Sequence, residues 1–330
     1  MKHLLIGGLT AAIFALPVAA QDYPAKEIQG VIQWGAGGST DVVMRTVTPH
    51  AERILGQKVV MRNMTGGVGA IATKFVAAQK DDGYTLLMGA ENPLLYKVMG
   101  LGDVDYSDYE TVNILARGVP ILVARNDAPF NTLPEMLAYI QANPGAVKFG
   151  STGPGGLASV VTAMLQSRHD LNVTAVPYDG DGPALTALQG GAIDVMPAVL
   201  GAAIESIKGG RMKAIALVDK DRAEALPDLA TISETNPEYD QYLPWGPFFG
   251  VFVKKGTPDE AVAKLVDAYA EGAKSDDFVN LMNERGYIIE SLSGEPAQQF
   301  LNGWQSTTAW LLQDAGLAKV SPEELGIPKP

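Results

Sequence analysis

Short apolar runs alternate with amphipathic stretches along almost the whole of this chain of 330 residues. Runs such as Ile28–Gln33 and Thr85–Met88 have the length of buried strands, whereas Asp41–Leu55 and Gly156–Arg168 have the apolar spacing of helices. Strands that alternate with helices in this way are typical of an α/β fold. The sequence therefore predicts an α/β protein with a mainly helical C-terminal third, clearest at Pro296–Ala315.

Two uninterrupted apolar runs, Ile114–Ala124 and Phe248–Val253, are candidates for strands that cross between two lobes. The chain has no internal repeat, low-complexity tract or flexible linker that would separate independent domains. A two-lobed binding protein joins its lobes through ordered strands. The two runs therefore leave a two-lobed organisation open.

The first twenty residues have the pattern of a secretory signal peptide. Met1–His3 is a short positive start, Leu4–Leu16 carries no charge, and Val18–Ala20 offers the small residues that a signal peptidase recognises. The apolar stretch is shorter than the roughly 20 residues that span a bilayer. We therefore expect residues 1–20 to be a signal peptide that is cleaved after Ala20, and the mature protein to be periplasmic.

The composition excludes several classes of function. Lys and Arg number 25 against 37 Asp and Glu, so the net charge is -12, and with no basic run this argues against nucleic-acid binding. The chain has no Cys, which excludes disulfides, iron–sulfur clusters and thiol catalysis. Outside the leader only His50 and His169 remain, too few for a multi-histidine metal site. We expect neither a metal nor a cofactor.

Two glycine-rich turns, each between a predicted strand and a predicted helix, are the strongest candidates for a ligand site. They are Trp34–Asp41 and Phe149–Gly156. Such a turn directs free backbone N–H groups and the positive end of a helix towards one point, where a carboxylate or phosphate can bind. Facing each other across a cleft, the two turns would hold one anion together. The alternative is that each is an ordinary capped turn.

Motifs for other chemistry are weak. Gly67–Ala72 superficially matches a dinucleotide-binding fingerprint, but extra residues separate it from the preceding strand and no acidic residue ends a strand at the required spacing. The sequence has no Gly-x-Ser-x-Gly nucleophile motif. These observations predict no catalytic residues and favour a binding protein over an enzyme.

Many short segments occur in the order expected of one known family. The segments are Tyr23–Ile28, Gly37–Asp41 with Arg45, Leu55–Val60, Asn63, Gly66–Gly69, Asp82–Leu87, Phe149–Gly153, Val176–Tyr178, Gly191–Asp194, Leu226–Asp228 and Gly256–Pro258. In these segments the chain resembles the Bug-type periplasmic solute receptors of tripartite tricarboxylate transporters, over essentially its whole mature length.

The resemblance implies a two-lobed, Venus-flytrap protein of the type II periplasmic class. One lobe would comprise residues 21–116 plus 253–330, and the other residues 117–252. The implied function is to capture a small organic carboxylate without chemistry, as a monomer, and to deliver it to the large and small membrane subunits of the transporter. An exported α/β enzyme or a ligand-sensing subunit on the same scaffold is the alternative.

The family holds the ligand's carboxylate with amides and hydroxyls of two loops, one on each lobe. Here the matching positions include Ser39 in the first loop and Thr152 in the second, whereas Asp41 is expected to organise its loop rather than to contact the ligand. The full set of predicted binding residues is Trp34, Gly37, Gly38, Ser39, Thr40, Asp41, Glu91, Ser151, Thr152, Gly153, Gly156, Tyr178, Asp179 and Ala198.

Departures from the family pattern bear on the identity of the cargo. Trp34 leads into the first loop, Gly156 stands where a serine is frequent, and Asp179 follows Tyr178 where a basic residue is common, with Asp181 close behind. Glu91 adds a further acid. Such an acidic cleft would disfavour a tricarboxylate, so we expect a monocarboxylate, a dicarboxylate or a carboxylate with amine or hydroxyl groups. The alternative is that these acids face solvent.

Overall fold

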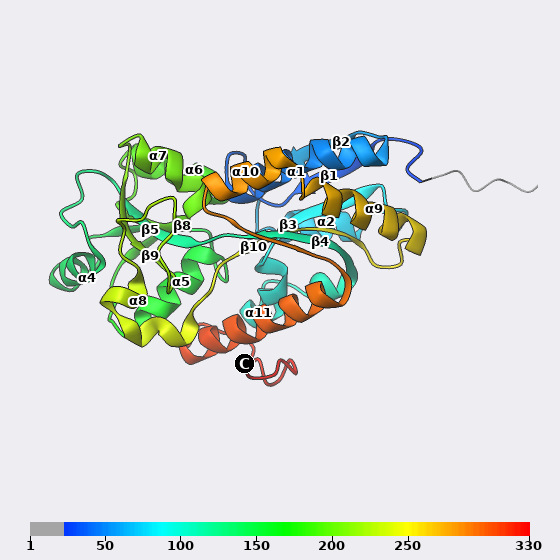
Figure 1. Cartoon of the computed structure of the whole chain (residues 1–330). Helices are drawn as coiled ribbons and strands as arrows, with labels where there is room; N and C mark the ends of the chain where they lie inside the picture. Colours follow the sequence, from blue (N-terminus) through cyan, green and yellow to red (C-terminus); the bar gives the residue numbers. More distant parts are fainter. Residues whose placement is uncertain (1–22) are drawn as a thin grey trace, which may run out of the picture.

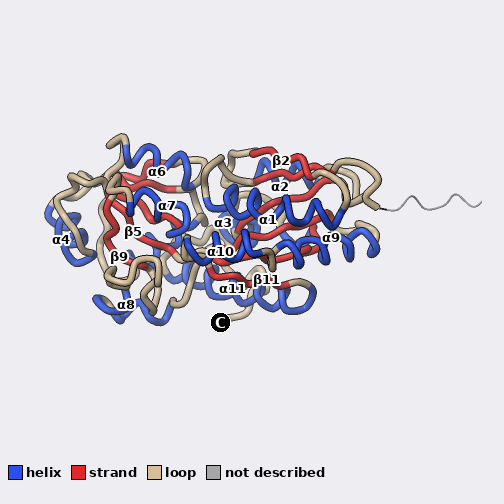
Figure 2. The backbone as a smooth tube through the Cα atoms, turned by 45° about the horizontal axis from the view of Figure 1, so that its top comes forward, coloured by secondary structure: helices blue, strands red, loops and turns tan. Residues whose placement is uncertain are grey.

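The computed structural model describes residues 23–330. The predicted signal peptide and its cleavage after Ala20 lie outside the described residues. The chain forms an elongated molecule with two sheets side by side, each accompanied by its own helices (Figure 1). Seen from a second direction, the strands run through the middle and helices lie outside them (Figure 2).

The first sheet has six strands in the order β11-β4-β10-β3-β1-β2. Its central strand β3 is parallel to β1 and antiparallel to β10, and both β3 and β10 are almost fully buried. The strands are β1 (Ile28–Ile32), β2 (Val59–Asn63), β3 (Thr85–Ala90), β4 (Tyr109–Arg117), β10 (Phe248–Lys254) and β11 (Ile288–Leu292). The helices that accompany this sheet are α1 (Ser39–Leu55), α2 (Ala70–Ala77), α3 (Tyr96–Met99), α9 (Asp259–Gly272), α10 (Asp276–Glu284) and α11 (Gly294–Asp314).

The second sheet has five strands in the order β7-β6-β8-β5-β9. β6 is parallel to both of its neighbours, whereas β5 is antiparallel to both of its own. The strands are β5 (Pro120–Ala124), β6 (Lys148–Ser151), β7 (Thr174–Pro177), β8 (Val195–Val199) and β9 (Lys213–Leu217). Its helices are α4 (Leu133–Ala142), α5 (Leu157–Gln166), α6 (Asp181–Gln189), α7 (Leu200–Lys208) and α8 (Ile232–Thr235). Three short 3-10 turns, η1 (Asn92–Leu95), η2 (Tyr106–Asp108) and η3 (Pro237–Tyr242), complete the fold.

The chain passes between the sheets twice, and the two crossings touch. The N–H of Gly118, between β4 and β5, donates to the carbonyl of Pro247, just before β10, at 2.8 Å. The predicted lobe boundary between Phe252 and Val253 falls inside β10, a strand that lies entirely in the six-stranded sheet. The apolar run marks a buried central strand rather than the crossing itself. We therefore place the second crossing before Phe248, and the division into moving lobes stays a prediction.

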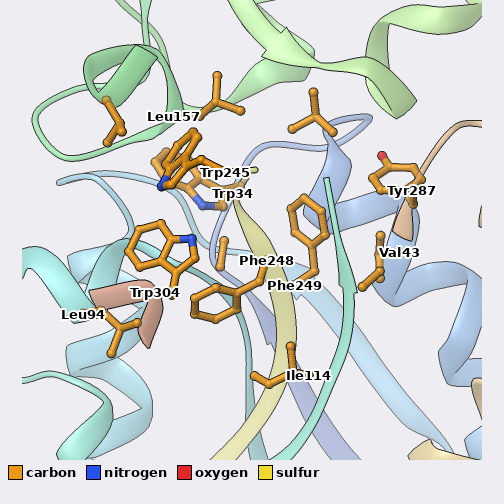
Figure 3. Packing of buried hydrophobic residues seen from close by; sticks show 14 of the residues in the cluster. Trp34, Val43, Leu94, Ile114, Leu157, Trp245, Phe248, Phe249, Tyr287 and Trp304 are labelled. Atoms are coloured by element: carbon orange, nitrogen blue, oxygen red, sulfur yellow. The ribbon is translucent and has the colours of Figure 1, made fainter. Parts of the chain in front are cut away.

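An aromatic cluster fixes the C-terminal helix α11 to the second crossing. Trp304 on α11 packs edge-on against Phe248 and donates its indole N–H to the carbonyl of Gly246 at 2.8 Å. The indole N–H of Trp245 donates to the hydroxyl of Thr308, also on α11, at 3.0 Å. Figure 3 shows Trp245, Trp304 and Phe248 in this cluster. Because α11 packs against both β4 and α5, it touches both halves of the molecule.

Within residues 23–330, no helix combines the length and the apolar character that a membrane crossing requires.

Candidate functional site

The first glycine-rich turn joins β1 to α1 and is held in shape by Asp41. One carboxylate oxygen of Asp41 accepts the N–H of Gly37 at 3.0 Å. The other accepts Nε of Arg45 at 2.8 Å and Nδ2 of Asn63 at 2.9 Å. These donors all come from the same half of the molecule, so Asp41 organises the turn, as its sequence context suggests.

The turn places the start of α1 in the interior. Gly38 is the N-cap, no side chain caps the helix, and Ser39 and Thr40 are buried. The first N–H groups of a helix have no partner inside the helix and carry its positive partial charge. The beginning of α1 therefore offers hydrogen-bond donors to an acceptor in the interior.

The second glycine-rich turn joins β6 to α5, and its key side chain is Thr152. The side chain is 6% exposed, and its hydroxyl has no hydrogen-bond partner among the described residues. Gly156, the N-cap of α5, lies against this hydroxyl: a Cβ there would approach Oγ1 of Thr152 to 2.5 Å. The glycine that replaces the family's frequent serine thus makes room for the threonine hydroxyl.

A small cavity of about 30 Å³ lies between the two turns. This is room for about two water molecules. Both halves of the molecule contribute to its wall: the start of α1, the end of β3, the turns before α5 and α6, the end of β8 and the start of β10. Its lining residues are Trp34, Gly38, Ser39, Thr40, Ala90, Glu91, Thr152, Leu157, Gly180, Asp181, Val199, Pro247 and Phe249.

Direct hydrogen bonds join the two halves around this cavity. The hydroxyl of Ser39 donates to Oδ2 of Asp181 at 3.2 Å, and that oxygen also accepts the N–H of Val199 at 3.2 Å. Further bonds between the halves are Gly35 N–H to Asp179 O at 3.0 Å, Thr65 Oγ1 to Asp179 Oδ2 at 3.3 Å and Asn92 Nδ2 to Gly155 O at 3.3 Å. The halves are therefore closed on each other, and a larger ligand can enter only when they separate.

Two buried carboxylates, Glu91 and Asp181, face this cavity from opposite halves. Glu91 is 3% exposed and Asp181 is 9% exposed, and neither forms an ion pair within residues 23–330. Burial raises the pKa of Glu91 to about 8, and the charge of Asp181 contributes to this rise. Burial also raises the pKa of Asp181 to about 6, although the Val199 N–H and the Ser39 hydroxyl favour its ionised form. No group of three or more potential metal ligands occurs in the same part of the chain.

The sequence model described as "Tripartite tricarboxylate transporter family receptor" matches residues 43–317, most of the chain. The chain belongs to this receptor family. Membership confirms the resemblance drawn from the short segments, and with it a solute-binding receptor rather than an enzyme.

Individual relatives agree with this assignment. The receptor is 32% identical over 286 residues to the protein BugT of Bordetella pertussis, covering 84% of this chain and 86% of that one. It superposes on the periplasmic binding protein BugD with a TM-score of 0.84 at 27% identity, covering 90% of this chain and 99% of that one. It also superposes on MatC from Rhodopseudomonas palustris with bound malate, with a TM-score of 0.80 at 25% identity, covering 89% of this chain and all 100% of that one. The likeness to BugD confirms the two-lobed α/β fold of a periplasmic binding protein.

The receptor's cavity contains fewer than half of the residues predicted to bind ligand. Those that line it are Trp34, Gly38, Ser39, Thr40, Glu91 and Thr152. Asp179 is exposed, and with Gly153 and Tyr178 it lines a neighbouring surface hollow. Gly37, Asp41, Ser151 and Gly156 support the two turns; for example, Oγ of Ser151 accepts the N–H of Gly153 at 3.1 Å. Ala198 is buried within β8, opposite Ile121 of β5.

The predicted binding set does not contain Asp181, Val199 or Phe249, which line the cavity. Asp181 was expected near the cleft as an acid close behind Asp179, but the structure places Asp181 in the cavity wall and Asp179 outside it. Phe249 follows the crossing into β10, so its place beside the cavity depends on how the halves close. Only the three-dimensional arrangement reveals it.

Proposed function

We propose that this receptor binds a small organic carboxylate between its two halves and delivers it to a tripartite transporter with a large and a small membrane subunit. The observation that carries the proposal is the pair of glycine-rich turns, which bring the starts of α1 and α5 to one cavity from opposite halves. Helix starts and hydroxyls together form a suitable site for a carboxylate. The malate bound in MatC, a protein of the same fold, supports this class of cargo.

In this proposal, the carboxylate accepts hydrogen bonds from the first turn of α1, the hydroxyl of Thr152 and the first turn of α5. Trp34 and Phe249 form apolar walls. Closure around the crossings near Gly118 and Pro247 then stabilises the bound form, because only the closed form brings both turns to the ligand. The receptor acts as a monomer in the periplasm after cleavage behind Ala20.

Thermal unfolding of the mature chain, from Gln21 onward, tests the class of cargo. The panel contains monocarboxylates, dicarboxylates, tricarboxylates and amino acids. A ligand at about 100 times its dissociation constant adds ~2.7 kcal/mol to the free energy of unfolding. A shift confined to a few carboxylates, which are then recovered chemically unchanged, is the expected result. A flat panel for both native and refolded protein would contradict the proposal.

Thr152→Val tests the site itself. We expect the affinity for a carboxylate found in the panel to fall about tenfold, because a hydrogen bond to a charged acceptor is lost. Thr162→Val is the matched control, since the Thr162 hydroxyl on α5 already donates to the carbonyl of Ala158 at 2.6 Å. Titration calorimetry measures both variants. Equal affinities would remove Thr152 from the site.

A further inference from the structure

We infer that the cargo carries a positively charged amine as well as its carboxylate, and that Glu91 and Asp181 bind the ammonium group. The inference rests on the proposed function, which it narrows from carboxylates in general to amino-carboxylates. It follows from the two acidic residues that line the cavity and from the absence of Lys, Arg and His among the lining residues.

The first step is the position of the two acids. Glu91 directly follows β3 in one half, Asp181 is the first residue of α6 in the other, and both line the same cavity. Both side chains are at least nine-tenths buried, and no Lys, Arg or His of residues 23–330 pairs with either. An unpaired buried charge is costly, and the raised pKa of Glu91 reflects this cost. A cation bound beside both acids would stabilise their ionised forms.

The second step is an independent sign of a polar ligand. The hydroxyl of Thr152 is buried in the same wall and has no hydrogen-bond partner in the described part of the chain. Buried hydroxyls usually do have a partner. A ligand that places its carboxylate beside Thr152 would supply one, and a second polar group of the same ligand could then reach the two acids.

The third step distinguishes an ammonium from a second carboxylate. Asp181 already accepts the Ser39 hydroxyl and the N–H of Val199, next to the starts of α1 and α7. The protein's own carboxylate therefore occupies two of the donors that a second ligand carboxylate could use. A dianion would also place its second charge next to Asp181 without a basic residue in the cavity wall to offset it, and it would further oppose the ionisation of Glu91. An ammonium instead donates up to three hydrogen bonds to these oxygens.

Titration calorimetry near pH 7 on matched pairs of small molecules tests the inference. The pairs are aspartate with succinate, glutamate with glutarate, and 4-aminobutyrate with butyrate, which differ by the amine alone. The proteins are the mature wild type, Glu91→Gln and Asp181→Asn. Asp170→Asn is the control, because this acid belongs to the same half as Asp181 but is exposed and outside the cavity. Circular dichroism checks that each variant is folded. If Asp181→Asn does not fold, the affinities of Glu91→Gln decide the test.

We expect at least one amino-carboxylate to bind at least about tenfold more tightly than its amine-free partner. Glu91→Gln should lower the affinity for that ligand by about tenfold or more. The amine-free acid should bind this variant at least as tightly as it binds the wild type. Asp170→Asn should bind like the wild type. Amine-free acids that bind the wild type as tightly as their partners would overturn the inference and leave the proposed function standing. Preference for the amine that survives Glu91→Gln would also overturn it. If no member of the panel binds, the inference fails, and the wider thermal-unfolding panel decides the proposed function.

Discussion

Glu91 has the most unusual environment of the acidic residues in the cavity. Burial raises its pKa to about 8, and nearby Asp181 contributes to the rise. The other titratable groups around it are Tyr96 and Tyr106, and burial raises the pKa of both hydroxyls above the usual range, so they stay neutral. The folded, ligand-free protein therefore holds a proton at Glu91 that an unfolded chain would release above the ordinary pKa of 4.5.

This proton makes stability depend on pH in a predictable direction. The folded state binds more protons than the unfolded state between about pH 4.5 and 8, so the free energy of unfolding decreases as the pH rises through this window. The decrease due to one proton is at most about 1.4 kcal/mol per pH unit. We expect Glu91→Gln to lack this contribution, so that its melting temperature gains on the wild type from pH 6 to pH 8. A constant difference between the two melting curves would contradict the assignment.

At the scale of elements, local patterns predicted the strands and helices well but not their partners. Ile28–Gln33 and Asp41–Leu55 correspond to β1 and α1, and Pro296–Ala315 to most of α11. Ile114–Ala124 was predicted as one run, yet it forms the end of β4 and the whole of β5, in different sheets, with Gly118 between them. An apolar run records burial, whereas long-range pairing decides which sheet a strand joins.

The candidate site was likewise predictable from local sequence only in part. Both glycine-rich turns were predictable, because the order of strand, turn and helix is local in the sequence. The bond between Ser39 and Asp181 joins residues 142 positions apart, and no local pattern reports it. The burial of Glu91 likewise depends on the closure of the two halves. Sequence therefore predicted the donors of the site and Glu91, but it gave neither the burial of this acid nor the bond between Ser39 and Asp181.

The second crossing depends on the absence of a side chain at Gly246. A Cβ there would lie 2.0 Å from the carbonyl oxygen of Gly118 in the first crossing. We expect Gly246→Ala to lower the free energy of unfolding by about 1–3 kcal/mol, because backbone must move to relieve the overlap. Gly303→Ala is the control, since this helical residue on α11 has open space around it, and it should gain about 0.5–1 kcal/mol. Urea denaturation measures both, and an equal effect of the two substitutions would contradict this role.

At the scale of the whole molecule, closure brings two backbone segments into close contact beside the cavity. Gly182 on α6 faces the turn before α1: a Cβ at this position would lie 2.5 Å from the carbonyl oxygen of Ala36 and 3.0 Å from the N–H nitrogen of Gly38. The halves cannot approach to the same distance if a side chain intervenes at this position.

Gly182→Ala should therefore weaken ligand binding without weakening either half. We expect the affinity to fall about tenfold, because the overlap of the added Cβ with the backbone of Ala36 destabilises the closed form to which the ligand binds. Gly190→Ala at the end of the same helix is the control, since its added Cβ would come no nearer than 3.5 Å to its neighbours. Titration calorimetry gives the affinities, and small-angle X-ray scattering with saturating ligand reports how compact each variant becomes. Unchanged affinity together with full compaction would refute the role of Gly182.

The placement of the indoles has a practical consequence. The chain has four tryptophans. Trp34 lies in the cavity wall, and Trp245 and Trp304 pack at the second crossing with ring centres 5.9 Å apart. Emission from an indole responds to the polarity and motion of its surroundings, and three of these four stand where the halves meet. If cargo capture closes the halves as proposed, native fluorescence should change on binding, and a stopped-flow instrument would time the closure without an attached dye.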